Sequence, residues 1–325
     1  MIHSTAISPD ADVVECADAW LEALRGFVEP DAITLVGLDP LRTDDRHVVL
    51  ASTGYSEEVL RHATSAFLEN PVHRLTLTAG MPLRWRDLRR DWDIDFAHSA
   101  TGEDLLTPAG YHEGASASLR LARGRYVGGL HVSWNQASAA TDQRRDAIAR
   151  LMPILANDLD LMREPNSLAR RLPPTFSARL ISRSGDPASL DFREQGPHLS
   201  DTGHLWRLLT ANGGRPPVGR SLWIDADRKV HRVHVIACRS DARLVTEVEV
   251  DAPFRLSIRE LEVLHWVAGG ASNPEIARRI FVSTRTVATH VEHLLQKLGC
   301  RTRAELAATA VREELLLAGL PDSGA

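Results

Sequence analysis

Lysine is almost absent from this 325-residue sequence, in which only Lys229 and Lys297 accompany a large number of arginines. A phosphorylatable receiver domain needs a lysine late in its fold to hold the phosphoryl oxygen. No lysine precedes Lys229, so the sequence argues against aspartyl phosphorylation in that part of the chain. Asp39 ends an apolar run as a receiver acceptor would, but it is predicted to be a turn residue beside Pro40.

Cysteine is scarce as well, and long apolar runs are missing. Cys16, Cys238 and Cys300 are isolated and odd in number, which favours a reducing compartment over a disulfide framework. No basic start is followed by an apolar run, and no stretch reaches about 18 apolar residues. We therefore expect a cytoplasmic protein without a membrane partner. The formal net charge of -5 excludes a general attraction for nucleic acid, so any such binding must come from a local surface.

The composition is otherwise that of globular domains, with 43% hydrophobic and 25% charged residues. The length allows two or three domains. The fold class predicted is α+β and multidomain. Its first part follows an order of helix, two strands, helices, an irregular aromatic segment, two strands and a closing helix. These elements are predicted at residues 13–27, 32–38, 46–53, 57–68, 81–111, 115–122, 125–134 and 141–162.

This order resembles the GAF sensor domain over residues 13–162, and the resemblance depends on the strand pair between Leu119 and Trp134. It implies a small-molecule site between the sheet and the variable segment. The aromatic side chains there are either ordinary core or the lining of such a site. The candidate ligand-binding residues are Trp85, Trp92, Phe96 and Tyr111.

Prolines and arginines mark a linker at residues 163–175, followed by a smaller mixed domain at 176–250. Its predicted strands are 176–182, 221–225, 229–237 and 243–250, with a helix near 201–210. This order is loosely similar to a shortened PAS-like domain.

Helix boundaries are clearest in the C-terminal part, between Leu256 and Leu317. Three of four predicted helix starts have a Ser or Thr followed three residues later by Glu, which is the capping-box pattern. The pairs are Ser257 with Glu260, Ser272 with Glu275, and Thr302 with Glu305, whereas Ser283 has a cap alone. Glycines at Gly269, Gly270, Gly299 and Gly319 are predicted to end these helices. The segment is thus predicted to be an independently folding four-helix domain.

The third of these helices has one apolar stripe and one polar face. Val287, Val291, Leu294 and Leu298 share the stripe that must be buried. The opposite face carries hydrogen-bonding side chains suited to base edges, namely Arg285, Thr289, Glu292 and Gln296. A helix from about Pro274 to Ile280 and a tight turn precede it, which is a helix-turn-helix arrangement. A small helical bundle that binds protein would explain the stripe, but not the ordered pattern across all four helices.

Three short motifs resemble the LuxR-type helix-turn-helix of bacterial transcription regulators: Arg259–Leu264, Gly270–Ala277 and Thr286–Val291, followed by Lys297-Leu298-Gly299. The resemblance, assigned to residues 253–319, implies a third helix in the major groove of double-stranded DNA. It further implies a fourth helix, predicted at 303–317, that pairs two subunits over a two-fold site. The sequence departs from the family at Pro274 and at Ala288, where the family usually has lysine. Together with the anionic Glu292, this loss predicts weak non-specific binding.

The side chains that flank the four residues suited to base edges are predicted to contact phosphates and groove edges. The complete predicted DNA-binding set is Arg278, Thr284, Arg285, Thr286, Ala288, Thr289, His290, Glu292, His293, Gln296 and Lys297.

Other chemical patterns are weak. Residues 214–221 have the spacing of a phosphate-binding P-loop with Arg220 in place of lysine, but prolines remove amide donors and a strand is expected to follow. His231, His234 and Cys238 cannot converge on a metal, because strand alternation points His231 to the other side. No catalytic set and no cofactor or metal site is predicted.

The sequence thus predicts a homodimeric, DNA-binding transcription regulator that works with RNA polymerase and is controlled by a small-molecule effector or a protein signal at the GAF-like domain. The alternative is a signalling enzyme that hydrolyses nucleotide or processes cyclic nucleotide, with a DNA-targeting domain.

Overall fold

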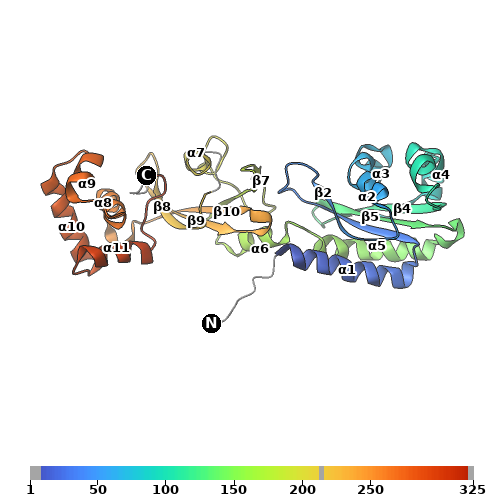
Figure 1. The fold of residues 1–325 in the computed structure, drawn as a ribbon, viewed down its shortest axis with the longest axis horizontal. Coiled ribbons are helices and arrows are strands. Elements are labelled where there is room, and N and C mark those ends of the chain that lie inside the picture. Colours follow the sequence, from blue (N-terminus) through green and yellow to red (C-terminus); the bar gives the residue numbers. More distant parts are fainter. Residues whose placement is uncertain (1–8, 212–215, 321–325) are drawn as a thin grey trace. The chain divides into compact units, whose positions relative to one another are not determined.

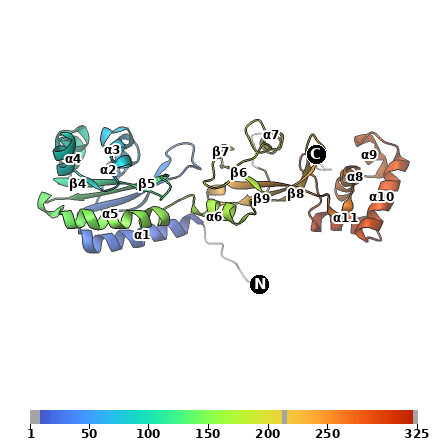
Figure 2. The same cartoon turned by 180° about the vertical axis from the view of Figure 1, so that it is seen from behind.

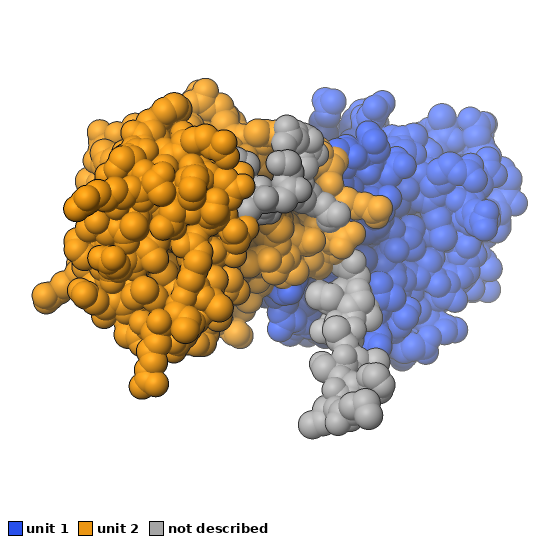
Figure 3. Space-filling model, turned by 60° about the vertical axis from the view of Figure 1, so that its left-hand side comes forward, with its two compact units in different colours: residues 1–164 blue, residues 165–325 orange. Residues whose placement is uncertain are grey.

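The computed structural model describes residues 9–211 and 216–320 (Figure 1). Contacts divide the chain into two units, with the division between Glu164 and Pro165 (Figure 3). Residues 176–250 and 253–319, predicted as separate domains, both lie in the second unit. Within the described part of the chain, no helix combines the length and apolar character needed to cross a membrane.

The first unit is built on an antiparallel sheet of five strands in the order β2-β1-β5-β4-β3. Helices α1 and α5 cover one face of this sheet, and α2, α3 and α4 cover the other (Figures 1 and 2). The elements are α1 Pro9–Val28, β1 Ala32–Leu38, β2 His47–Thr53, α2 Glu57–Thr64, α3 Pro71–Ala79, β3 Leu83–Arg84, α4 Trp85–Trp92, β4 Glu113–Arg120, β5 Tyr126–Trp134 and α5 Asp142–Asp158. The predicted order of elements is confirmed.

Strand β1 is buried from Ala32 to Gly37 because both faces of the sheet are covered. It lies between β2 and β5, and both pairings are antiparallel. Gly128 in β5 allows the close approach of β1, since a Cβ atom there would lie 2.0 Å from the carbonyl oxygen of Val36. The sheet therefore places β5 at its centre, with side chains of alternate residues on opposite faces.

The prediction of an irregular segment at 81–111 was wrong in part, because α4 and shorter helical turns lie within it. The start of α4 is held by Asp87, which accepts from the backbone N–H of Arg84 at 3.2 Å and from its guanidinium at 2.8 Å. Both side chains are buried. Arg84 also donates to the carbonyl oxygen of Ala140 at 2.7 Å. This long-range pairing, which local sequence does not reveal, orders the segment.

The second unit contains another antiparallel sheet of five strands, in the order β7-β6-β10-β9-β8. Its elements are α6 Arg163–Arg171, β6 Ser177–Ile181, β7 Pro187–Ala188, α7 His204–Thr210, β8 Gly219–Ile224, β9 Val230–Ala237 and β10 Arg243–Val250. When the strands of each unit are numbered along the chain, both sheets have the order 2-1-5-4-3. The two sheets therefore share one connectivity.

Residues 163–175, predicted as a linker, are helical as far as Arg171. Asn166 is buried in α6 and makes two hydrogen bonds with Asp191, at 2.9 and 3.2 Å. Arg193 donates to the carbonyl oxygens of Ala169 and Leu172 at the end of the helix. Helix α6 is thus attached to the segment that follows β7 rather than being an open connection.

Four helices follow the second sheet and confirm the predicted helical C-terminal domain: α8 Ile258–Ala268, α9 Asn273–Arg279, α10 Thr284–Leu298 and α11 Arg303–Arg312. Ser257 and Glu260 form the predicted reciprocal cap, with bonds of 3.2 and 2.7 Å. At α11 only half of the predicted box forms, because Glu305 accepts from the backbone of Arg301 instead of Thr302. Leu261, Leu264, Ile276, Val287 and Leu294 are fully buried in the shared core of these helices.

Helix α11 ends at Arg312, so the prediction of a helix as far as residue 317 was wrong. Glu314 adopts a positive φ of 59°, and the chain then turns onto strand β8. The backbone N–H of Leu222 donates to the carbonyl oxygen of Leu316 at 2.8 Å, and that of Ala318 donates to the carbonyl oxygen of Leu222 at 2.7 Å. We call residues 315–318 the C-terminal segment. Its strand-like pairing outweighs the helix propensity of its three leucines, because it buries two of them.

The substitution Leu317→Ala tests the role of the C-terminal segment. Leu317 is 6% exposed and packs in the same core as Leu222 and the helices. Its truncation is expected to lower the free energy of unfolding of the second unit by about 2–5 kcal/mol, measured by urea denaturation of the full chain. The control Val218→Ala, at a side chain of the same unit that is 54% exposed, should change it by less than about 0.5 kcal/mol. Equal stability of both variants would contradict the packing described.

Candidate nucleic-acid interface and sensor cavity

Helices α9 and α10 meet at a tight turn formed by residues 280–283. Ile280 is buried at the end of α9, and Phe281 adopts a positive φ of 55°. The backbone N–H of Val282 donates to the carbonyl oxygen of Ala277 at 3.0 Å, and Ser283 caps α10 through the N–H of Thr286. The chain thus reverses within a few residues, as the helix-turn-helix prediction requires. The side chain of Phe281 is 93% exposed on this turn.

The outer face of α10 is open along its length. Val287 and Leu294 are fully buried, while Val291 and Leu298 pack at the edge of the core. The residues predicted to face bases, Arg285, Thr289, Glu292 and Gln296, are all exposed. Their contact with DNA stays a prediction, and the structure leaves them accessible for it.

The flanking residues of the predicted set differ in exposure. Arg278, Thr284, Thr286 and His293 are exposed, whereas Ala288 and His290 are half-buried.

Two hydroxyl groups of this surface already have partners within the chain. That of Thr289 donates to the carbonyl oxygen of Arg285 at 3.2 Å, and that of Thr286 lies 2.8 Å from the Ser283 hydroxyl. Each hydroxyl oxygen still has acceptor capacity.

Lys297 has a structural role that the sequence did not reveal. Its ammonium group donates to the carboxylate of Glu260 at 2.7 Å and to the carbonyl oxygen of Arg255 at 3.0 Å. Glu260 is 4% exposed and at the same time caps α8 through the N–H of Ser257. Lys297 therefore ties the end of α10 to the start of α8, and its charge is compensated. This placement does not favour the predicted use of Lys297 as a phosphate contact.

The pKa of Glu260 reflects the same arrangement. Burial works against the charged carboxylate, but hydrogen bonds from Lys297 and Ser257 outweigh this effect and hold the pKa of Glu260 below its ordinary value. The carboxylate is thus charged at neutral pH and dependent on its partners.

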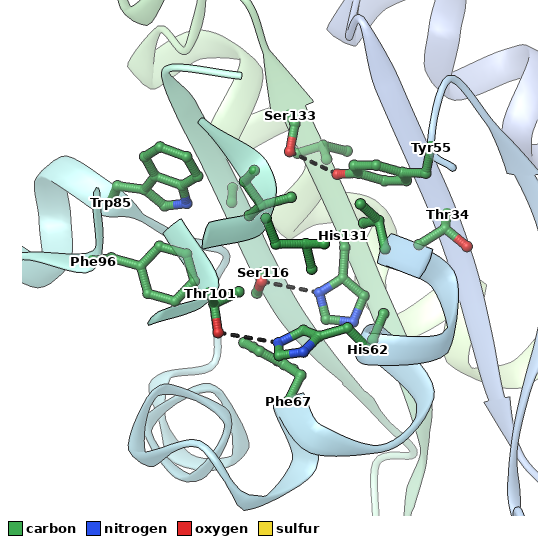
Figure 4. Close-up of a pocket in the computed structure, with 16 residues that line it drawn as sticks. Thr34, Tyr55, His62, Phe67, Trp85, Phe96, Thr101, Ser116, His131 and Ser133 are labelled. Carbon is green, nitrogen blue, oxygen red and sulfur yellow. Dashed lines mark hydrogen bonds between the residues drawn. The ribbon is translucent and has the colours of Figure 1, made fainter. Parts of the chain in front are cut away.

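A small cavity lies in the first unit between the sheet and the helices α2 and α4 (Figure 4). Its volume is about 40 Å³, room for only a few atoms, whereas sites for larger ligands measure several hundred Å³. Of the residues predicted for a ligand site, Trp85 and Phe96 line the cavity, with ring centroids 5.3 Å apart. Tyr111 lies outside the lining, where its hydroxyl donates to the carbonyl oxygen of Gly54 at 2.7 Å. Trp92 is 41% exposed and does not reach the cavity.

Polar groups in the cavity form three hydrogen-bonded pairs that the sequence analysis did not identify (Figure 4). They are the Tyr55 and Ser133 hydroxyls at 2.7 Å, the Ser116 hydroxyl and His131 Nδ1 at 2.9 Å, and His62 Nε2 and the Thr101 hydroxyl at 3.0 Å. The signal was the occurrence of His131 and Ser133 at alternate positions of an otherwise apolar strand, since both side chains then point to one face.

Histidine 131 is neutral in this environment. Burial, with smaller contributions from His73, His62 and His47, lowers the pKa of His131 from 6.5 to about 4. A neutral imidazole offers one donor and one acceptor. The cavity is thus suited to a small molecule recognised by hydrogen bonds and apolar contact rather than by charge.

The described part of the P-loop-like sequence does not form a phosphate site. Strand β8 begins at Gly219, so a strand and not a helix follows the loop, as predicted. Gly214 and Arg215 lie outside the described residues.

The comparison with known families concerns the helical domain. Residues 255–310 match the family described as bacterial regulatory proteins, LuxR family. The oxygen regulatory protein NreC of Staphylococcus carnosus is 48% identical over 65 residues, which are 20% of this chain and 30% of NreC. Its counterpart in Staphylococcus aureus strain JH9 is 46% identical over the same length. The chain thus spans about a third of the length of the curated relatives it matches.

Solved structures align over more of the chain, but with low scores. Escherichia coli SdiA aligns at 17% identity and a TM-score of 0.33, covering 93% of this chain and 92% of SdiA. A GAF domain/HD domain protein of Geobacter sulfurreducens aligns at 18% identity and a TM-score of 0.34, covering 47% of this chain and 95% of that one. TM-scores this low do not by themselves assign the fold of either unit.

The substitution Lys297→Met tests the pairing with Glu260. A carboxyl group whose pKa is lowered on folding contributes stability above its unfolded pKa of about 4.3, and this contribution is lost as the pH falls through the folded pKa. Without Lys297 the buried carboxylate lacks its cation, so we expect a loss of about 1–3 kcal/mol at pH 7 that narrows below about pH 4. Thermal unfolding at both pH values measures it.

The matched control is Lys229→Met, which removes the other lysine of the chain from an exposed pair with Glu249. Its effect should stay within about 1 kcal/mol at pH 7. A Lys297→Met protein as stable at pH 7 as this control would contradict the assigned role.

Proposed function

Because its C-terminal domain belongs to the LuxR family of helix-turn-helix domains, we propose that this chain is a sequence-specific, DNA-binding transcription regulator. The exposed polar face of α10, opposite an apolar stripe that packs against the other helices, is the observation that supports this function most directly. A helix whose only role was packing would gain nothing from a continuous row of exposed hydrogen-bonding side chains beside an ordered turn.

The dimensions of this face fit one half-site. Arg285 and Gln296 lie on the same helix, and at a rise of 1.5 Å per residue they are about 16 Å apart along it. This length corresponds to roughly five base-pair steps at 3.4 Å. We assign Arg285, Thr289, Glu292 and Gln296 to base edges, with Glu292 accepting from a cytosine amino group. Arg278, Thr284, Thr286, His290 and His293 are assigned to phosphates and groove edges.

Two subunits are proposed to act together, because the helical domain of one subunit offers few cations to the DNA. Arg279 is stacked on the Trp266 ring at 4.1 Å and Lys297 is paired with Glu260, which leaves Arg278 and Arg285 as the exposed arginines of α9 and α10 without such a role. Ala304, Ala308 and Val311 form a row of exposed small side chains on α11. This row is the proposed contact with a second copy.

The cavity of the first unit is the proposed input for a small-molecule effector, with a protein signal as the other possible input. RNA polymerase is the expected partner at the promoter. The proposal assigns no catalytic activity to the chain.

The double substitution Arg285→Ala and Thr289→Ala tests the DNA-binding assignment. Each base contact contributes about 1–3 kcal/mol of discrimination, so losing two should weaken binding to a selected operator at least about 30-fold. The operator is obtained by selection from random duplexes with the wild-type chain, and affinities are compared by mobility shift at one salt concentration.

The control for this experiment is Arg61→Ala, an exposed arginine of the first unit, which should bind the operator as the wild type does. Circular dichroism verifies that both variants are folded. An unchanged operator affinity of the double variant would refute the assignment.

The substitution Ala63→Leu tests the cavity as an effector site. Ala63 lies on α2 and lines the cavity, so a larger side chain fills a space of about 40 Å³. Native mass spectrometry of protein purified from its own host should show a bound small molecule in the wild type and its loss in Ala63→Leu. The nearby Ala66→Leu, at an exposed position, should retain it. A wild-type chain that carries no small molecule, or a variant that still does, would count against this input.

A further inference from the structure

Three ligand-type side chains converge at the end of the second sheet where strands β8 and β9 are connected. Asp225 follows strand β8, His231 lies on β9, and His198 comes from the loop before α7. Asp225 Oδ2 lies 3.1 Å from His231 Nε2 and 4.0 Å from His198 Nε2. The three ligand atoms all lie within 4.8 Å of one another. In the sequence His231 stands near His234 and Cys238, whereas the fold brings it to Asp225 and His198.

The hydrogen bonds of His231 are unusual for a buried histidine. Its Nδ1 lies 2.5 Å from Glu247 Oε1, while its Nε2 faces Asp225. All three side chains are at most 6% exposed. A neutral imidazole has a single N–H, so it can satisfy only one of the two carboxylates and directs a lone pair at the other. A proton, on His231 or on one of the carboxyl groups, or a metal ion between His231 and Asp225 is therefore needed at this place.

The geometry favours the metal ion. Zinc binds nitrogen and oxygen ligands at 2.0–2.2 Å in a tetrahedral arrangement, which separates neighbouring ligand atoms by about 3.4 Å. The two distances from Asp225, 3.1 and 4.0 Å, bracket this value, and the three ligand atoms lie within 4.8 Å of one another, so side-chain movements without a change of the backbone are required. A proton on His231 would account for Asp225 and Glu247, whereas a metal ion would also use His198, whose Nε2 lies 4.0 Å from the same carboxylate oxygen.

The surroundings supply the second shell that such sites need. Metal-bound histidines generally donate their other ring N–H to a carboxylate, and Glu247 stands in that position for His231. The other oxygen of Asp225 accepts from the backbone N–H of Lys229 at 2.8 Å, which fixes the carboxylate and leaves Oδ2 directed at the histidines. Trp223 packs against both imidazoles, with ring centroids at 4.9 and 5.1 Å. His198 is 29% exposed, which gives an ion a route of entry.

We propose that His198, Asp225 and His231 form a binding site for a divalent transition-metal ion of the zinc class, with Glu247 orienting His231. Three protein ligands leave a fourth position to water. The mixed nitrogen and oxygen set suits Zn²⁺ better than Mg²⁺ or Ca²⁺, which prefer oxygen alone. Bound metal would join the loop before α7 to β8 and β9 and so stiffen the sheet with which the C-terminal segment pairs.

The test uses the untagged full-length chain, stripped of metal with a chelator. Titration calorimetry with Zn²⁺ should show one site per chain with a micromolar or lower Kd, and Mg²⁺ should show none. Co²⁺ used as a probe should give the intense visible absorption of a four-coordinate ion. His198→Ala, at the most exposed ligand, should weaken Zn²⁺ binding at least tenfold and remove the Co²⁺ spectrum.

Two further variants keep the result unambiguous. Asp225→Asn retains an oxygen acceptor for the Lys229 N–H but loses the ligand charge, so it should also bind at least tenfold more weakly while keeping its circular dichroism spectrum. His98→Ala removes a 74% exposed histidine from the first unit and should bind Zn²⁺ as the wild type does. Absence of saturable binding by the wild type, or equal affinity of His198→Ala and wild type, would overturn the proposal. An equal loss in His98→Ala would do the same, because it would reveal adventitious surface histidines.

Discussion

Backbone pairing between Leu222 and the C-terminal segment joins the second sheet to the helical domain. The two hydrogen bonds of Leu222, at 2.8 and 2.7 Å, extend the edge of the sheet by a short parallel segment. They place Leu315 and Leu317 in the core of the helices, where His265 accepts from the N–H of Leu317 at 3.2 Å. A helical domain connected only by its N-terminal end would turn freely about residues 251–255. The second attachment restricts that motion, so a change in the sheet can bear on the DNA-facing helix.

The two sheets share one strand order but differ in what their side chains do. Both sheets follow the strand order 2-1-5-4-3, although the sequence shows no internal repeat. The first sheet is covered by helices on both faces and encloses a small cavity lined by hydrogen-bonded polar pairs. The second instead concentrates its polar groups around His231 and adds the C-terminal segment at its edge. Strand order is set by backbone pairing and loop lengths, so it can persist where side chains have no similarity.

Electrostatic compensation limits what the DNA-facing helix can do alone. The sequence offers Lys297 at the end of α10, but the structure uses it to neutralise the buried Glu260, and Arg279 is stacked on Trp266. A buried carboxylate without a cation costs more than one solvated phosphate contact returns. The domain therefore keeps its fold at the expense of cationic surface. The proposed pairing of two subunits would double the number of cationic contacts.

Local sequence by itself determined the helix starts, the apolar stripe of α10 and most strands, because caps, glycines and periodicity act over a few residues. It determined likewise that Arg285, Thr289, Glu292 and Gln296 share the outer face of one helix. Tertiary structure alone decided that α11 stops at Arg312, since the leucines after it satisfy helix and strand patterns equally and only the partner Leu222 distinguishes them. It also decided the roles of Lys297, His131 and His231, whose partners lie on other helices, strands or loops. Contacts of that kind arise from packing, which no local pattern encodes.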